Sequence, residues 1–166
     1  MLACARYEGA MRRLLHAYKY GRRRVLAGYF AGSALQTLER HAPNERFDAV
    51  IAVPSGRGRL LERGFNPPGL IASRVARGLG VRDLSDRLRR TDGGRSQSLL
   101  GRTQRLARER TRFSARALDG RIAAHVLLID DILTTGATVS DCALALKSSG
   151  VKRVTALVLT RGSMRP

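Results

Sequence analysis

Short apolar runs and amphipathic helical patterns alternate along most of this chain. The runs at 48–53, 125–129 and 151–160 have the length and β-branched content of buried strands, and 84–90 is a further candidate strand. Apolar residues recur at helical spacing over 8–20, 22–41, 66–78 and 138–149. Strands that alternate with helices predict an α/β fold, in which right-handed crossovers join a central parallel sheet flanked by helices.

The length of 166 residues is that of a single domain. We expect 1–44 to form N-terminal helices, 48–166 to form the core, and about 91–112 to form a mobile arm with a short helix near 99–108. Asn66 is the expected N-cap of the helix over 66–78, and the prolines that follow it suit a first helical turn.

Polar residues follow the predicted strand at 125–129 in an unusual order. Two adjacent carboxylates, Asp130 and Asp131, come first, and then a loop that contains Thr134, Thr135, Gly136, Ala137 and Thr138. In open α/β sheets ligands bind at the carboxyl ends of the strands, and a helix N-terminus attracts anions. Carboxylates accept hydrogen bonds from sugar hydroxyls, whereas threonine hydroxyls and backbone N–H groups donate to phosphate. The pattern therefore predicts a sugar-phosphate site.

A plainer explanation is that the acids only end a strand and Thr135 only caps a helix. Each half of the pattern alone would be weak. The complete order of strand, paired acids, Thr-Thr-Gly-x-Thr and helix is much more specific.

This segment closely resembles the phosphoribosyl-pyrophosphate signature of type I phosphoribosyltransferases. The resemblance implies the type I phosphoribosyltransferase fold, which is Rossmann-like, together with a flexible basic lid or hood. It implies that Asp130 and Asp131 are catalytic, face the ribose hydroxyls and reach Mg2+ through substrate or water. It also implies that the loop residues Thr134, Thr135, Gly136, Ala137 and Thr138 wrap the 5′-phosphate, and that pyrophosphate is bound after the strand at 48–53 by Ser55, Gly56 and Arg57.

Further sequence motifs between about residues 7 and 160 resemble those of the ComF family. Many members of this family are connected with DNA uptake in competent bacteria. The motifs are Tyr18-Lys19-Tyr20-Gly21-Arg22-Arg23, Val53-Pro54, Arg63-Gly64-Phe65-Asn66, and Arg90-Thr91 with Phe113 downstream. Three features depart from the family: the N-terminal four-cysteine zinc ribbon is absent, with only Cys4 in that region, Pro67 and Pro68 stand where a Gln is usual, and Arg108 stands where an Asn is usual.

The acceptor of the reaction is less readable. Phosphoribosyltransferases for 6-oxopurines often carry an Asp where this chain has Thr134, and a hydroxyl is a poor general base at neutral pH. This argues against a hypoxanthine or guanine acceptor.

The charge balance points to polyanionic partners. The chain has 31 Lys and Arg against 13 Asp and Glu, a net charge of +18. Arg63, Arg90 and Arg105 are candidates for a lid or for anion binding, although such arginines also suit a solvated surface or a nucleic-acid contact. Aromatic residues make up only 5% of the chain, so no stacking platform for bases is evident.

Two functions stay open. The first is an enzyme that binds phosphoribosyl pyrophosphate with Mg2+ and transfers phosphoribose to an unidentified nitrogenous acceptor. The second is a non-catalytic competence or DNA-uptake module that binds single-stranded DNA and recombination proteins. No apolar run reaches membrane-span length and no targeting segment is evident, so we expect a cytoplasmic protein without a membrane partner, with a homodimer as a candidate assembly.

Overall fold

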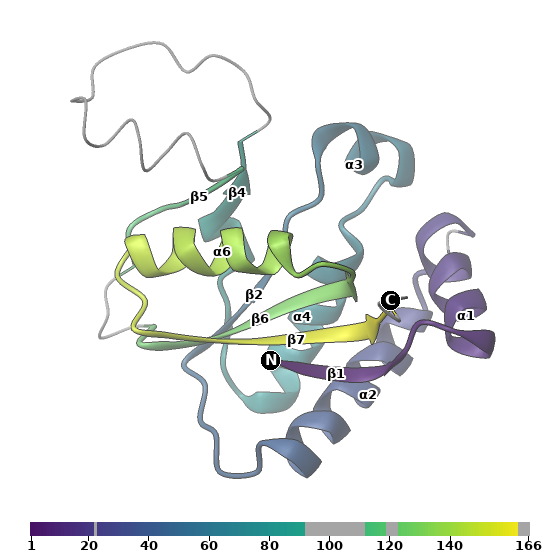
Figure 1. The fold of residues 1–166 in the computed structure, drawn as a ribbon, viewed down its shortest axis with the longest axis horizontal. Helices are drawn as coiled ribbons and strands as arrows, with labels where there is room; N and C mark the ends of the chain where they lie inside the picture. Colours follow the sequence, from purple (N-terminus) through teal and green to yellow (C-terminus); the bar gives the residue numbers. More distant parts are fainter. Residues whose placement is uncertain (22, 92–111, 119–122, 163–166) are drawn as a thin grey trace.

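A parallel sheet forms the centre of the computed structural model, which describes residues 1–21, 23–91, 112–118 and 123–162 (Figure 1). Within these residues the sheet has five strands in the order β1-β7-β6-β2-β3, and every neighbouring pair is parallel. The strands are β1 (Leu2–Arg6), β2 (Ala49–Ala52), β3 (Arg82–Asp83), β6 (His125–Leu133) and β7 (Arg153–Arg161). The expected α/β class is therefore confirmed.

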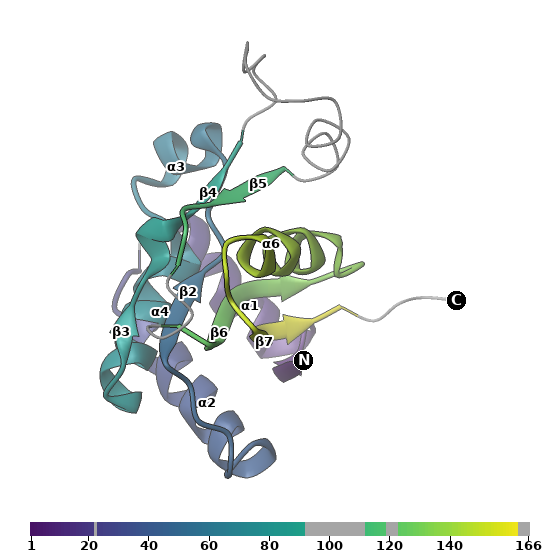
Figure 2. The same ribbon diagram turned by 90° about the vertical axis from the view of Figure 1, so that its left-hand side faces the viewer.

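Helices cover both faces of this sheet (Figure 2). One face carries three helices: α1 (Gly9–Tyr20), α2 (Leu26–His41) and α4 (Pro67–Leu79). The other carries α6 (Ala137–Ser148) and an antiparallel ribbon that follows the 3-10 turn η1 (Ser85–Arg87), made of β4 (Leu88–Arg90) and β5 (Phe113–Ala115). The short helix α3 (Arg57–Arg63) stands away from the sheet.

The central strand β6 divides the core in two, because successive side chains of a strand point to opposite faces. Leu127 and Ile129 are fully buried with α1, α2 and α4, whereas Val126 and Leu128 are fully buried with α6. This continuous apolar run is typical of a parallel strand that is covered on both faces.

Several expected boundaries were wrong. The N-terminal region is not only helical, because β1 pairs with β7 at the edge of the sheet. The strand predicted at 125–129 runs on to Leu133, since β7 continues beside it and pairs Ile132 with Thr160. Arg57 does not lie in a loop but opens α3, and the strand predicted at 84–90 is reduced to β4 by the turn η1. Most of the predicted arm lies outside the described residues.

Tyr18 joins α1 to the rest of the fold. Its side chain is fully buried, with ring centroids 5.3 Å from Phe30 and 5.6 Å from Phe65. Its hydroxyl donates a hydrogen bond of 2.8 Å to the carbonyl oxygen of Pro67, the first residue of α4. The last turn of α1 is thereby held against the start of α4.

We expect Tyr18→Phe to lower the free energy of unfolding by about 1–2 kcal/mol, because it removes the buried hydrogen bond to the Pro67 carbonyl. Urea denaturation measures this. The matched control is Tyr29→Phe, at a tyrosine that is 54% exposed, where the change should stay within about 0.5 kcal/mol. Equal effects of the two substitutions would contradict the assignment of an anchoring role to the Tyr18 hydroxyl.

Candidate ligand site at the carboxyl edge of the sheet

The order in which the chain adds strands to the sheet reverses between two neighbouring strands, β2 and β6. From β2 it continues through α4 to β3 on one side, and from β6 it continues through α6 to β7 on the other side. The two helices also lie on opposite faces. Because connections diverge from adjacent strands, the segments that follow them leave room for a ligand at their carboxyl ends. The loops after β2 and β6 are the predicted pyrophosphate and phosphate loops.

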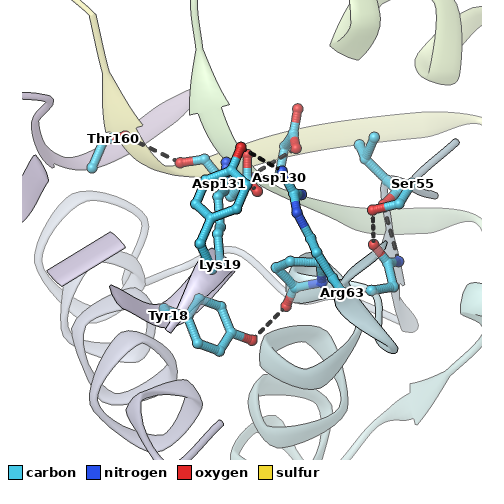
Figure 3. A network of polar contacts seen from close by, with 11 residues as sticks. Tyr18, Lys19, Ser55, Arg63, Asp130, Asp131 and Thr160 are labelled. Carbon is cyan, nitrogen blue, oxygen red and sulfur yellow. Dashed lines mark hydrogen bonds and ion pairs between the residues drawn. The ribbon is translucent and has the colours of Figure 1, made fainter. Parts of the chain in front are cut away.

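Asp130 and Asp131 lie inside β6 rather than after it, at the point where β6 extends beyond the end of β2. The alternation of the strand places Asp131 on the face of Ile129 and Asp130 on the face of Leu128. The two carboxylates therefore project to opposite sides of the strand (Figure 3). A ligand that lies across the edge of the sheet could be approached from both sides.

Asp130 is buried, with only 8% of the residue exposed. Its carboxylate accepts a hydrogen bond of 2.8 Å from the backbone N–H of Asp131. Burial, with the neighbouring charge of Asp131 adding to it, raises the pKa of Asp130 to about 7, although that hydrogen bond and the charge of Lys19 act in the opposite direction. Asp130 is thus a carboxyl group that titrates near neutral pH.

Asp131 is held from two elements. Its carboxylate Oδ2 lies 2.7 Å from Nζ of Lys19 on α1, and both side chains are largely enclosed, at 14% and 11% exposed. Its backbone carbonyl accepts a hydrogen bond of 3.2 Å from the hydroxyl of Thr160 on β7. The acidic pair therefore contains one carboxylate with an ammonium partner, seen in Figure 3, and one that is buried.

The loop after β6 presents its threonines to solvent. Thr134, Thr135 and Thr138 are all exposed. Gly136 has a φ of +82°, which a side chain would strain, and it directly precedes α6. The Thr135 hydroxyl accepts a long hydrogen bond of 3.4 Å from the Ala137 N–H. This loop brings hydroxyls and the N-terminus of a helix to one place, which is the chemistry that phosphate binding needs.

The loop after β2 is tied down by Asn66. The Ser55 hydroxyl donates to Asn66 Oδ1 at 2.8 Å, and Asn66 Nδ2 donates to the Val53 carbonyl at 3.2 Å. Asn66 is the N-cap residue of α4, as predicted, but its side chain makes no capping hydrogen bond. The side chain instead fixes Ser55 beside the carboxyl end of β2.

Two of the three candidate anion-binding arginines lie in the described part of the chain. Arg90 lies against the loop after β2. Its guanidinium is so close to Gly56 that the Cβ of any larger residue at this position would be 3.6 Å from it. Arg63, at the end of α3, donates a hydrogen bond of 2.8 Å to the Tyr20 hydroxyl and lies 4.6 Å from that ring. Arg105 lies outside the described residues.

Sequence reasoning missed Lys19 as a site residue. The segment Tyr18-Lys19-Tyr20 was noticed only for its resemblance to a family, but each of the three residues contacts a different element: α4, β6 and α3 in turn. A lysine near a helix end is ordinary in a sequence, so only the packing of α1 against the sheet indicates its role.

The carboxylates suit a hard cation such as Mg2+, which prefers oxygen ligands. Among the described residues, however, no cluster of three or more His, Cys, Asp or Glu side chains could hold a metal ion. The chemistry of the Asp130 and Asp131 carboxylates by itself fits Mg2+. None of the helices within the described ranges is both long and apolar enough to cross a membrane.

Relatives of known name match almost the whole chain. The DNA utilization protein YhgH of Escherichia coli O6:H1 is 30% identical over 167 residues, which cover 97% of this chain and 71% of that protein. The competence protein ComFC of Streptococcus pneumoniae is 30% identical over 93% of this chain and 65% of its own length. The chain belongs to the ComF family. No protein-family model matches the chain.

Solved structures place this ComF-family chain in the type I phosphoribosyltransferase fold. The glutamine phosphoribosylpyrophosphate amidotransferase of B. subtilis aligns with a TM-score of 0.54 and 18% identity, over 87% of this chain and 30% of that chain. The adenine phosphoribosyltransferase of Thermoanaerobacter pseudethanolicus aligns with a TM-score of 0.50 and 20% identity, over 86% of this chain and 72% of that chain. The expected fold is therefore confirmed.

The raised pKa of Asp130 makes stability depend on pH. The folded state binds a proton more tightly than the unfolded chain, so stability falls as the pH rises from about 4 to about 7. We expect Asp130→Asn to raise the free energy of unfolding at pH 8 by about 2–4 kcal/mol, because an amide carries no charge to bury, and by much less at pH 4.

Urea denaturation of the metal-free protein at the two pH values tests this. Asp86→Asn is the control, because the Asp86 side chain is 67% exposed and its replacement should change stability by no more than about 0.5 kcal/mol. A gain from Asp130→Asn that is equal at pH 4 and pH 8 would contradict the expected titration of Asp130.

Proposed function

We propose that this ComF-family chain binds 5-phosphoribosyl 1-pyrophosphate together with Mg2+ and transfers phosphoribose to a nitrogenous acceptor. One observation carries the proposal: the divergence of the chain between β2 and β6 brings an acidic pair, a threonine loop at a helix N-terminus and a second anchored loop to one edge of the sheet. A sugar that carries a phosphate at one end and a pyrophosphate at the other needs these three groups.

The 5′-phosphate is assigned to the loop after β6. Thr134, Thr135, Gly136, Ala137 and Thr138 would surround it with hydroxyls and backbone N–H groups. The exposure of the threonines and the left-handed conformation of Gly136 support this assignment. The positive end of the α6 dipole adds to the attraction.

The ribose is assigned to the acidic pair. Asp131 is the better direct acceptor for a ribose hydroxyl, since it is the more exposed of the two and its charge is balanced by Lys19. Asp130 would act from the other face of the strand, through water or through the substrate-bound metal. Its pKa near neutrality lets it become charged when a cation arrives.

The pyrophosphate is assigned to Ser55, Gly56 and Arg57 after β2, with Arg90 beside Gly56. In the reaction the bond from ribose carbon 1 to the pyrophosphate oxygen breaks, and the leaving group takes the electron pair. The acceptor nitrogen forms the new bond to carbon 1. Cationic groups at this position stabilise the charge that develops on the leaving group. Bound Mg2+ would supply further positive charge there.

Calorimetric titration tests the site, with phosphoribosyl pyrophosphate and ribose 5-phosphate as ligands. We expect micromolar binding of phosphoribosyl pyrophosphate that depends on Mg2+. Gly136→Ala should lower the affinity for both ligands by about tenfold, because it disturbs the phosphate loop that both would use. Arg57→Ala should lower only the affinity for phosphoribosyl pyrophosphate. Arg77→Ala, on the exposed last turn of α4, is the matched arginine control. Absence of phosphoribosyl pyrophosphate binding in folded wild-type protein would overturn the proposal.

A second candidate function is the binding of single-stranded DNA. It is favoured by Tyr20, which is 50% exposed and has the Arg63 guanidinium over its ring, since stacking on an aromatic ring beside a cation is a common way to bind single strands. The net charge of +18 and the names of the relatives, DNA utilization and competence proteins, agree with it. The sequence had indicated no such platform.

Fluorescence anisotropy with a labelled oligothymidylate measures this binding at several salt concentrations. Tyr20→Ala should weaken it by about tenfold, because stacking is worth about 1–3 kcal/mol per base, and the control Tyr20→Phe should retain it. The double variant Asp130→Asn with Asp131→Asn should leave the salt-sensitive binding of the oligonucleotide intact. Binding to Tyr20→Ala that equals wild type would exclude this surface.

A further inference from the structure

Lys19 is enclosed to an unusual degree for a lysine. Only 11% of its side chain is exposed, whereas lysines are among the residues least often buried. Its position is set from both sides, because Tyr18 is hydrogen-bonded to α4 and Tyr20 is hydrogen-bonded to Arg63. The fold thus delivers a single ammonium group to the face of β6 on which Asp131 lies (Figure 3).

The ion pair leaves hydrogen-bonding capacity unused. An ammonium has three donors and a carboxylate has two acceptor oxygens. Within the described residues, the contact between Lys19 Nζ and Asp131 Oδ2 is the only polar contact of either charged group. Two N–H donors and the Oδ1 oxygen therefore have no partner among the described residues.

A hydroxyl group matches this arrangement better than a phosphate or a simple cation does. It accepts one hydrogen bond and donates one, so it can engage the ammonium and the carboxylate together. A phosphate would be repelled by Asp131, and a cation would be repelled by Lys19. The loop after β6 follows Asp131 by only three residues and leads into the N-terminus of α6, which attracts phosphate, so a sugar phosphate held there by its phosphate would bring its sugar toward the pair.

We propose that Lys19 and Asp131 together recognise one ribose hydroxyl, with Lys19 donating a hydrogen bond to the hydroxyl oxygen and Asp131 Oδ1 accepting a hydrogen bond from the hydroxyl. The inference rests on the proposed function, since it requires that the site takes a ribose phosphate. Lys19 is then a specificity-determining residue that contacts the ligand. Its effect is to favour ribose over sugars that lack the hydroxyl, because such sugars leave the enclosed donors and acceptor unpaired.

The test compares ribose 5-phosphate with 2,3-dideoxyribose 5-phosphate, which keeps the phosphate but lacks both hydroxyls. NMR titration is suitable because it also detects weak binding, with dissociation constants in the millimolar range. Wild type should prefer ribose 5-phosphate by about tenfold or more. Lys19→Met should reduce the preference to about twofold or less and leave the affinity for the dideoxy compound unchanged. Lys152→Met, at an exposed lysine before β7, should keep the full preference.

Lys19→Met leaves the enclosed Asp131 charge without its partner, which can prevent folding. The double variant Lys19→Met with Asp131→Asn removes both charges, and it should fold and show the same loss of preference. It retains the loop after β6, so it should still bind the dideoxy compound as wild type does.

The outcomes separate the two proposals. Equal binding of both sugars by wild type overturns the role of the pair but keeps the phosphate site. A parallel loss of both affinities in Lys19→Met assigns Lys19 a purely structural role, and tighter binding of ribose 5-phosphate shows that Lys19 competes for Asp131. Both results overturn the inference. Failure of wild type to bind either sugar or phosphoribosyl pyrophosphate overturns the proposed function itself.

Discussion

The parallel pairing of β2 with β6 is the contact on which the candidate site depends. Their registered residues run from Ala49 opposite Val126 to Ala52 opposite Ile129, so two segments more than seventy positions apart end at the same edge. Since the connections from these strands lead in opposite directions and onto opposite faces, this edge is the position at which open α/β sheets bind ligands. Without this pairing the threonine loop and the Ser55 loop would be unrelated surface turns.

Electrostatics at this edge work against stability. Two consecutive carboxylates lie beside a core whose nearest strand residues are fully buried. The structure balances one charge with Lys19 and leaves the other to a shifted pKa, so Asp130 is held at a cost to the ligand-free fold. Such local conflict is common where a site must accept a charged ligand. The ion pair and the buried carboxyl group thus divide the two aspartates into different roles, although they are neighbours in the chain.

Helix α1 links the packing of the fold to the chemistry of the site. The buried ring and hydroxyl of Tyr18 fix the helix, and the next residue, Lys19, reaches Asp131 as a consequence. The following residue, Tyr20, receives Arg63 from α3. Three adjacent residues therefore connect a core contact, a charge contact and an exposed aromatic surface. This coupling ties the two candidate functions to one segment of the molecule.

The sequence by itself determined the class of the fold and the chemistry of the loop after β6. Periodicity and β-branched content report local burial, so they located β2, β6, α4 and α6, and the run from Asp130 to Thr138 carries its chemistry in consecutive residues. Tertiary structure decided what depends on distant partners. It placed β1 at the sheet edge, used the side chain of the N-cap residue Asn66 to hold Ser55, and extended β6 so that Asp130 and Asp131 point to opposite faces. It also brought Lys19 to Asp131. No local pattern encodes the contact between Lys19 and Asp131, because it arises only when α1 packs against a strand more than a hundred residues away.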